Sequence, residues 1–326
     1  MTNHLTAQSV AQSQQLASQQ KNITVIGSGA WGSTLGTLAT RNGHQVRSWS
    51  RRSSESLDSA IEGADAILSA VSMKGVRPTV ERLQGMNLPA ELILISATKG
   101  LDPTTTHTPS QIWQEGFPNH SVVVLSGPNL SKEVKQDLPA ATVVASKVTA
   151  AAEAVQDIFA SETFRVYLND DPLGTEIGGT LKNVIAIAAG VCEGLKLGTN
   201  AKSALLTRAL PEMIRVGSCL GASTETFFGL SGLGDLLATC DSPLSRNYQV
   251  GYGLAQGKSI EQILSELEGT AEGINTTNVL VDFANQQEIA IPIARQVYRL
   301  VNGKTTPQQA VQDLMERDPK PEFCDL

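Results

Sequence analysis

The chain of 326 residues has a deficit of basic residues, few cysteines and no long apolar run. It carries 25 Lys and Arg against 32 Asp and Glu, and the resulting net charge of -7 argues against nucleic acid or an anionic membrane as main partner. Any phosphate site must therefore be a local cluster of cations. The four cysteines, Cys192, Cys219, Cys240 and Cys324, are widely spaced and show no metal or redox pairing, as is typical of reduced thiols in a cytosolic protein.

Residues 1–20 contain no Lys or Arg, and their composition is dominated by Gln, Ser, Thr and Ala. This composition does not suit a signal peptide or an Arg-rich transit peptide, and it predicts a disordered tail. The most apolar run, residues 184–192, is too short to span a membrane and is typical of a buried helix. We therefore expect a cytoplasmic protein without a membrane span.

The most informative pattern is a glycine-rich turn directly after an apolar run. It reads Gly27-Ser28-Gly29-Ala30-Trp31-Gly32. In Gly-x-Gly-x-x-Gly motifs the first glycine permits a tight turn, the second lets the backbone approach a pyrophosphate, and the third lets the next helix pack closely. A helix-like run over residues 31–41 follows and stops at Asn42-Gly43, so its N-terminus would offer free N–H groups to phosphates. A plain strand-turn-helix is the alternative, but this context favours a dinucleotide site.

The residues after the second apolar run indicate which dinucleotide is bound. NAD-binding proteins usually have Asp or Glu about 20 residues beyond the glycines, on the ribose 2′-hydroxyl. This chain has Ser50-Arg51-Arg52-Ser53 instead, and two guanidinium groups can hold a 2′-phosphate with bidentate bonds. A solvated basic turn is the alternative. The pattern favours NADP(H), with NAD(H) as a second cofactor.

Strand-like and helical patterns alternate up to about residue 170. The short Val-, Ile- and Leu-rich runs that predict strands are residues 23–27, 45–50, 66–71, 92–97, 121–125, 142–145 and 164–168. Helical runs such as 77–83 and 150–159 lie between several of them. The alternation predicts a parallel, doubly wound sheet of the Rossmann type.

Helical spacing dominates after residue 170. Two helix starts carry patterns that resemble capping boxes, namely Ser259 with Gln262, and Thr306-Pro307 with Gln309. We therefore expect a tail at 1–20, a dinucleotide-binding domain at 21–170 and an all-helical substrate-binding domain at 171–326.

Several polar residues are poorly explained by core formation. Lys182 and Asn183 interrupt a small, apolar helical run, where a cation is costly unless it is paired or faces a cleft; a lysine that reaches solvent is the alternative. Asp235 lies close to glycines and, taken alone, is best explained as a helix cap. Lys99 ends the fourth apolar run, at the edge where open α/β sheets bind ligands, although an exposed loop lysine fits as well.

A turn at residues 242–244 leads into Ser245-Arg246-Asn247. A hydroxyl, a guanidinium and an amide together suit an oxyanion such as phosphate. The start of a surface helix explains the same residues equally well.

Together these segments resemble one family, the soluble NAD(P)-dependent glycerol-3-phosphate dehydrogenases of the bacterial type. Besides the glycine motif, the resemblance rests on Thr98-Lys99-Gly100, Ser126-Gly127-Pro128-Asn129, residues 181–186, residues 194–198, residues 232–236, Thr239-Cys240, residues 242–247 and Ala271-Glu272-Gly273. It covers nearly the whole chain after the tail. The fold that it implies is a Rossmann-type domain followed by an all-helical domain like that of 6-phosphogluconate dehydrogenase.

The resemblance also implies roles for matching residues. The catalytic positions are Lys182, as proton donor and acceptor, with Lys99 and Asp235. The substrate positions are Lys99, Gly127, Asn129, Lys182, Asn183, Asp235, Ser245, Arg246 and Asn247. The cofactor positions are Gly27, Ser28, Gly29, Ala30, Trp31, Gly32, Arg51, Arg52, Lys99, Ser131, Arg246 and Glu272.

The implied activity is reduction of dihydroxyacetone phosphate to sn-glycerol 3-phosphate for glycerophospholipid synthesis, by a homodimer. Hydride transfer at C2 must be matched by proton transfer at the C2 oxygen, and a lysine ammonium can donate that proton. A free lysine has a pKa of about 10.4, so burial or a neighbouring cation must lower it for chemistry near neutrality. Lys99 is a candidate for that cation, while Asp235 would orient Lys182 and oppose the shift.

Two alternatives stay open: a dehydrogenase of similar build that acts on a 3-hydroxy acid, and a non-catalytic nucleotide sensor. Two features also depart from the family pattern. The segment between residues 53 and 64 is shorter than usual, which would trim the rim around the adenosine. Asn129 stands where the family has a serine, and we expect a change of detail there rather than a loss of activity.

The basic pair generates a prediction about cofactor choice. Replacing Arg51 by Asp and Arg52 by Ala should raise the Michaelis constant for NADPH much more than that for NADH, because only NADPH carries the 2′-phosphate. Steady-state kinetics with both cofactors measure the two constants. An equal rise in both would contradict the assignment.

Overall fold

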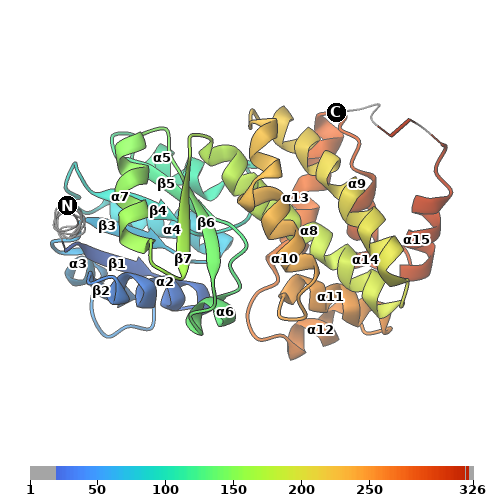
Figure 1. Cartoon of the computed structure of the whole chain (residues 1–326), viewed down its shortest axis with the longest axis horizontal. Coiled ribbons are helices and arrows are strands. Elements are labelled where there is room, and N and C mark those ends of the chain that lie inside the picture. Colours follow the sequence, from blue (N-terminus) through green and yellow to red (C-terminus); the bar gives the residue numbers. More distant parts are fainter. Residues whose placement is uncertain (1–19, 320, 323–326) are drawn as a thin grey trace, which may run out of the picture.

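The computed structural model describes residues 20–319 and 321–322. The tail expected at 1–20 therefore lies outside the described residues except for Gln20, and so does Cys324. An α/β part, blue to green in Figure 1, lies beside a helical part, yellow-green to red. Within the described residues, no helix combines the length and the apolar character needed to cross a bilayer.

The α/β part is built on a seven-stranded sheet in the order β2-β1-β3-β4-β5-β6-β7. The strands are β1 Asn22–Ile26, β2 Gln45–Trp49, β3 Ala66–Ser69, β4 Ile93–Ser96, β5 Val122–Ser126, β6 Ala140–Ala145 and β7 Phe164–Asn169. Each end lies within two residues of the run that predicted it, and the Rossmann-type prediction is confirmed.

One feature of the sheet differs from the expectation of wholly parallel strands. β6 runs antiparallel to β5, and β7 is parallel to β6, whereas β2, β1, β3, β4 and β5 are parallel. Parallel neighbours need a crossover of a dozen or more residues, usually through a helix. Between β5 and β6 the chain forms only the short helix α6, Ser131–Lys135, and returns along the edge of β5.

Helices cover both faces of this sheet. They are α2 Ala30–Arg41, α3 Leu57–Ile61, α4 Met73–Gln84, α5 Pro109–Gly116 and α7 Thr149–Phe159. Alternate strand residues point to opposite faces: Ile23 and Val25 belong to the core shared with α2 and α7, and Ile26 belongs to the core shared with α3, α4 and α5. The sheet is thus doubly wound.

The helical part begins directly after β7. Its elements are α8 Pro172–Gly194, α9 Gly198–Cys219, a 3₁₀ turn η1 Thr224–Phe228, a π turn η2 Leu230–Gly234, α10 Asp235–Cys240, α11 Arg246–Ala255, α12 Ile260–Glu266, α13 Glu272–Gln286, α14 Pro292–Val301 and α15 Pro307–Met315. The capping box expected at Ser259 and Gln262 forms. At Thr306 only half of it forms, because the side chain of Gln309 donates to Asp313 instead.

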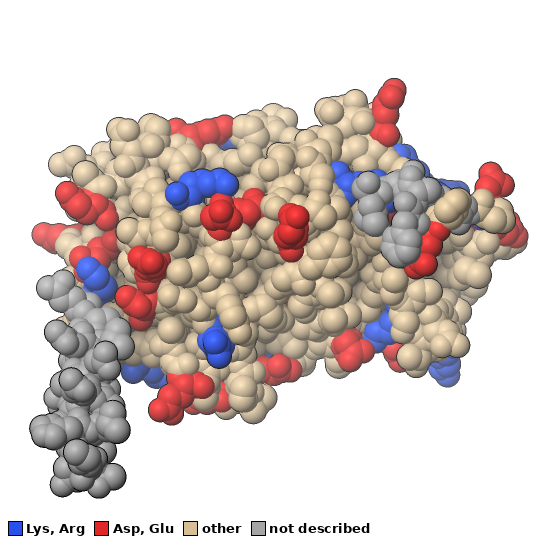
Figure 2. Space-filling view, turned by 45° about the horizontal axis from the view of Figure 1, so that its top comes forward, with Lys and Arg blue, Asp and Glu red and all other residues tan. Residues whose placement is uncertain are grey.

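Charged side chains are spread over the face shown in Figure 2, where red and blue groups are scattered among tan ones. A surface that binds a polyanion would instead gather Lys and Arg in one patch. The scattered charges on this face agree with the acidic net charge of -7.

The central element of the helical part is α8, which packs against α9, α10, α11, α13 and α14 and also against β5. Its crossing with α11 brings the two backbones together. A Cβ on Gly190 would lie 2.0 Å from the carbonyl oxygen of Tyr248, and one on Gly251 would lie 1.8 Å from that of Ile187. Only glycine fits at either position, so this crossing fixes α11, whose first turn carries Arg246 and Asn247, against α8.

This crossing predicts a large effect of one methyl group. Gly251→Ala should lower the free energy of unfolding by about 2 kcal/mol or more, because the helices must separate to admit the methyl group. Urea denaturation measures the change. Gly85→Ala is the matched control, since its Cβ would meet only the carbonyl oxygen of Arg82, at an ordinary 3.6 Å. Equal stability of the two variants would contradict the prediction.

Candidate active site

A cleft of about 810 Å³ lies where the carboxyl ends of the parallel strands face the helical part. The predicted site residues that line it are Gly29, Ala30, Trp31, Lys99, Asn129, Ser131, Lys182, Asn183, Ser245, Arg246, Asn247 and Glu272. The others, Gly27, Ser28, Gly32, Arg51, Arg52, Gly127 and Asp235, are not among its lining residues. The cleft therefore collects residues from segments that are far apart in the sequence.

The glycine turn has the geometry that its sequence predicts. Gly27 has a φ of 115°, and a Cβ there would lie 2.7 Å from the carbonyl oxygen of Ala70. A Cβ on Gly32 would lie 2.2 Å from the carbonyl oxygen of Gly27, so the helix packs closely on the turn. A Cβ on Gly29 would meet nothing within 4 Å, and no side chain caps α2 at this residue. The open space beside uncapped N–H groups fits a pyrophosphate.

The basic pair lies beyond β2, in an exposed turn. Ser53 Oγ accepts the Ser50 N–H at 3.0 Å, which shapes this turn. Among the described residues, neither Arg51 nor Arg52 has a side-chain hydrogen bond or ion pair. Both guanidinium groups are thus available beyond the carboxyl end of the strand next to the glycine turn. The shortened segment that follows forms a single short helix, α3, capped by Ser56.

Two lysines meet on one carboxylate at the floor of the cleft. Lys182 Nζ donates to Asp235 Oδ1 at 2.7 Å, and Lys99 Nζ donates to Asp235 Oδ2 at 2.5 Å. The carboxylate is 2 % exposed and the side chain of Lys182 is 9 % exposed. Asp235 therefore does not cap a helix, and Lys182 does not reach solvent; both of those alternatives are wrong.

The surroundings of Lys182 bring its proton exchange close to neutral pH. Burial lowers the pKa of Lys182 to about 8, the charge of Asp235 opposes that shift, and the charge of Lys99 adds to it. The neighbouring thiol stays neutral, because burial raises the pKa of Cys240 to about 12. Lys182 is thus a group that can carry or release a proton at physiological pH.

The sequence did not single out Thr239 as a site residue. Its Oγ1 accepts a hydrogen bond from Lys182 Nζ at 2.5 Å and lies 3.2 Å from Asp235 Oδ1. Asp235 and Thr239 are four residues apart, so their side chains share one face of α10. This spacing was the signal that could have identified Thr239 once Asp235 was assigned.

A second polar group follows on α11. Asn247 Nδ2 donates to Asn183 Oδ1 at 2.9 Å, while Asn247 Oδ1 accepts the Gly273 N–H at 3.0 Å. Ser245 Oγ accepts the N–H of Tyr248 at 3.3 Å and caps the helix. Arg246 is exposed at the start of the helix and lines the cleft. The helix-start interpretation is therefore confirmed, and the oxyanion interpretation stays a prediction, with Arg246 as the group that lines the cleft.

Two further candidates connect neighbouring elements at the cleft. Asn129 Nδ2 donates to the carbonyl of Ala141 at 2.9 Å, and its Oδ1 accepts from Thr142 Oγ1 at 2.8 Å, so Asn129 ties the loop after β5 to β6. Glu272, at the start of α13, accepts the backbone N–H of Met73 on α4. Burial raises the pKa of Glu272, while that hydrogen bond and the charge of Arg246 oppose the rise.

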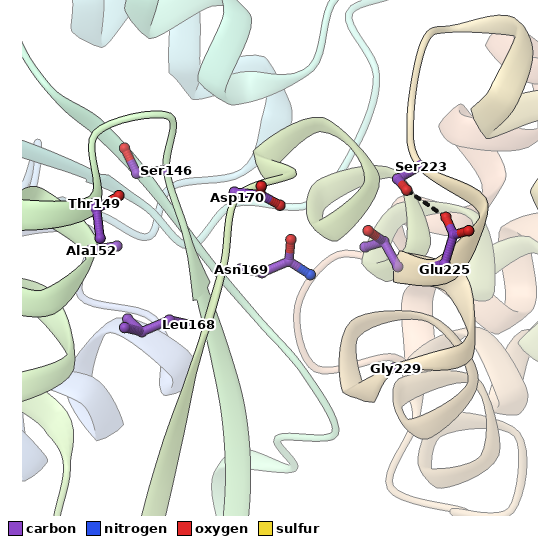
Figure 3. A pocket seen from close by; sticks show the side chains of 10 residues that line it. Ser146, Thr149, Ala152, Leu168, Asn169, Asp170, Ser223, Glu225 and Gly229 are labelled. Carbon is purple, nitrogen blue, oxygen red and sulfur yellow. Dashed lines mark hydrogen bonds between the residues drawn. The ribbon is translucent and has the colours of Figure 1, made fainter.

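A second cavity, of about 470 Å³, lies between β7, the start of α7 and η1 (Figure 3). Its charged lining residues are Asp170 and Glu225, and Ser223 donates to Glu225 at 2.7 Å. The larger cleft has cations among its lining residues, Lys99, Lys132, Lys182 and Arg246, beside the carboxylates of Glu266, Glu268 and Glu272. A phosphorylated ligand therefore suits the larger cleft and not the one in Figure 3.

The chain matches two family models that together span most of its length. NAD-dependent glycerol-3-phosphate dehydrogenase N-terminus matches residues 22–56 and 52–152, and the C-terminus of the same family matches residues 171–312. The break in the first match falls at the shortened segment.

Relatives and solved structures agree with this match. The chain is similar to glycerol-3-phosphate dehydrogenase [NAD(P)+] of Acaryochloris marina, with 66% identity over 93% of this chain and 98% of the relative. The enzyme of the same name from Synechocystis is 63% identical to it, over 93% of this chain and 96% of the relative. A crystal structure of glycerol-3-phosphate dehydrogenase from Coxiella burnetii has 32% identity and a TM-score of 0.87, covering 91% of this chain and 99% of that one.

The expected resemblance is therefore confirmed, over both the sheet and the helices. The chain belongs to the NAD-dependent glycerol-3-phosphate dehydrogenase family.

Proposed function

We propose that this chain catalyses the reversible reduction of dihydroxyacetone phosphate to sn-glycerol 3-phosphate with NADPH or NADH. The observation that carries the proposal is the pair of lysines on Asp235, both of which line a cleft that is also lined by the glycine turn and by Arg246. The names of the relatives, glycerol-3-phosphate dehydrogenase [NAD(P)+], support the same substrate and both cofactors.

The cofactor would be held from the glycine turn to the cleft floor. Gly29 and the first N–H groups of α2 suit the pyrophosphate, and Arg51 with Arg52 suit the 2′-phosphate of NADP(H). When bound, the nicotinamide supplies or takes up the hydride. Trp31, Ser131 and Glu272 line the cleft and are assigned to cofactor contacts by their match to the family.

Lys182 is proposed as the proton donor. As the C2–H bond forms, the electron pair of the carbonyl passes to oxygen, and the Lys182 ammonium gives that oxygen a proton. The neutral amine then regains a proton from solvent. Asp235 holds Lys182 in place through a hydrogen bond of 2.7 Å, and the nearby charge of Lys99 stabilises the forming alkoxide.

The substrate phosphate is assigned to Arg246 and the start of α11. An N-terminal helix turn and a guanidinium both favour an oxyanion. Asn247 and Asn183 already bond to each other, so they shape this end of the cleft and orient the helix that presents Arg246. Gly127 and Asn129 remain assigned to the substrate by their match to the family.

We further assign residues 21–170 to cofactor binding and 171–326 to substrate binding, in a cytoplasmic homodimer that supplies glycerophospholipid synthesis. Cys192, Cys219 and Cys240 are free thiols, which supports a reducing compartment. The homodimer is supported by the family resemblance alone, and sedimentation of the purified protein tests it.

The proposed reaction is tested by following NADPH oxidation with dihydroxyacetone phosphate. Dihydroxyacetone, which lacks the phosphate, is the control for Arg246, and NADH is the control for Arg51 and Arg52. Rapid oxidation with the phosphorylated ketone alone supports the proposal. Turnover of 3-hydroxy acids, or NADPH binding without turnover, would instead support one of the two alternative functions.

Removal of the proton donor should separate chemistry from binding. Lys182→Ala should lower kcat by at least about 10²-fold while leaving NADPH affinity nearly unchanged, because the lysine serves the reacting oxygen. Kinetics and a fluorescence titration with NADPH measure the two effects. Lys202→Ala is the matched control: Lys202 is also partly buried and pairs with Asp241, but it does not line the cleft. Activity retained by Lys182→Ala would refute the assignment.

The pKa of Lys182 predicts opposite pH dependences for the two directions. Reduction needs the ammonium, so its kcat/KM should fall as the pH rises through about 8. Oxidation of glycerol 3-phosphate needs the neutral amine, so its kcat/KM should rise over the same range. Initial rates from pH 6 to 10 test both, and the same direction of change in both reactions would contradict the assignment.

A further inference from the structure

A second buried carboxylate lies on α8, on the N-terminal side of Lys182. Glu176 is 1 % exposed and is not a lining residue of the cleft. Its Oε1 accepts from Ser96 Oγ at 3.0 Å, and its Oε2 accepts from Ser110 Oγ at 2.6 Å and from the Ser110 N–H at 3.1 Å. Burial raises the pKa of Glu176, and the hydrogen bonds from Ser110, Thr108 and Ser96 oppose that rise. Within the described part of the chain, no cation pairs with it.

One helical turn later, α8 makes a second bond to the same stretch of chain. Thr180 Oγ1 accepts the N–H of Gly100 at 3.0 Å. Ser96 is the last residue of β4, and Gly100 follows Lys99 directly. The segment that carries Lys99 is therefore fastened to α8 at both of its ends.

Between these two bonds the side chain of Lys99 crosses the surface of α8. A Cβ on Gly179 would lie 3.2 Å from Cε of Lys99 and 2.3 Å from Oγ of Ser126. Because Gly179 has no side chain, the space through which the Lys99 side chain reaches Asp235 stays free. α8 carries Lys182 itself and, through Glu176 and Thr180, also carries the attachment of Lys99.

We propose that Glu176 and Thr180 are positioning residues that hold the Lys99 ammonium at its place beside Asp235 and Lys182. They act through Lys99 and touch neither substrate nor cofactor. The proposal rests on the proposed function, because the pH dependence of that reaction is used to measure the pKa of Lys182.

A displaced Lys99 would have a defined electrostatic effect. The charged or titratable groups that face Lys182 are Asp235 and Cys240 on α10, and Lys99 after β4. Retreat of Lys99 removes a cation that lowers the pKa of Lys182 and leaves Asp235 to interact with Lys182 alone. Both changes raise the pKa of Lys182. A residue that only held the fold together would not move this value in one direction.

The test compares Glu176→Ala and Thr180→Val with Glu212→Ala. Glu212 is a matched control because it is also a buried carboxylate: it accepts the N–H groups of Ile293 at 3.0 Å and Ala294 at 2.8 Å, at the start of α14. For each variant, kcat/KM for reduction is measured from pH 6 to 10, together with the melting temperature. In the wild-type protein kcat/KM for reduction should fall at high pH, and this fall is the alkaline limb of the profile. In Glu176→Ala and Thr180→Val the limb should lie at a pH higher by about half a unit or more. Glu212→Ala should lower the melting temperature without moving the limb.

A conservative variant completes the test. Thr180→Ser keeps the acceptor for Gly100 and should retain the limb of the unmodified protein. If Glu176→Ala does not fold, Thr180→Val tests the same attachment alone. An unmoved limb in Thr180→Val, or an equal shift in Glu212→Ala, would overturn the proposal. Absence of activity in the unmodified protein would instead overturn the proposed function, so the two failures are distinguishable.

Discussion

A buried ammonium is costly, and the cleft is organised around lowering that cost at Lys182. The carboxylate of Asp235 stabilises the charge but is shared with Lys99, so neither lysine has it alone. An unshared carboxylate would hold the proton on Lys182 more firmly, whereas no carboxylate would leave the amine neutral. Burial lowers the pKa of Lys182 to about 8; Asp235 opposes this shift and Lys99 adds to it, so a proton can move in either direction near physiological pH.

This balance depends on close packing around α8. Glycines let the helix approach its neighbours: Gly190 meets α11, and Gly179 leaves room for Lys99. Glu176 and Thr180 then fasten the helix to the sheet side of the molecule. The proposed proton donor Lys182, the neighbouring cation Lys99 and the start of α11 are therefore all positioned by the one helix α8.

The sequence predicted the strands because buried parallel strands are short, apolar and bounded by turn residues, as in residues 23–27 and 66–71. It did not predict the reversal at β6, because an apolar run has no direction and the connection through α6 gives no helix-length signal. For the candidate site, the glycine turn and Lys182 stood out locally. The interactions of Asp235, Thr239 and Glu176 did not, since each depends on a partner distant in sequence or on a helix face defined only after folding.

The crossing of α8 and α11 also limits how the sequence can vary. At most packed positions a larger side chain can be accommodated by a smaller one opposite. At Gly190 and Gly251 the opposing atoms are the carbonyl oxygens of Tyr248 and Ile187, which every amino acid possesses. A substitution on the opposite helix cannot remove a backbone carbonyl oxygen, so it cannot compensate for a larger residue at Gly190 or Gly251. We therefore expect both glycines to be kept while other positions of the crossing vary.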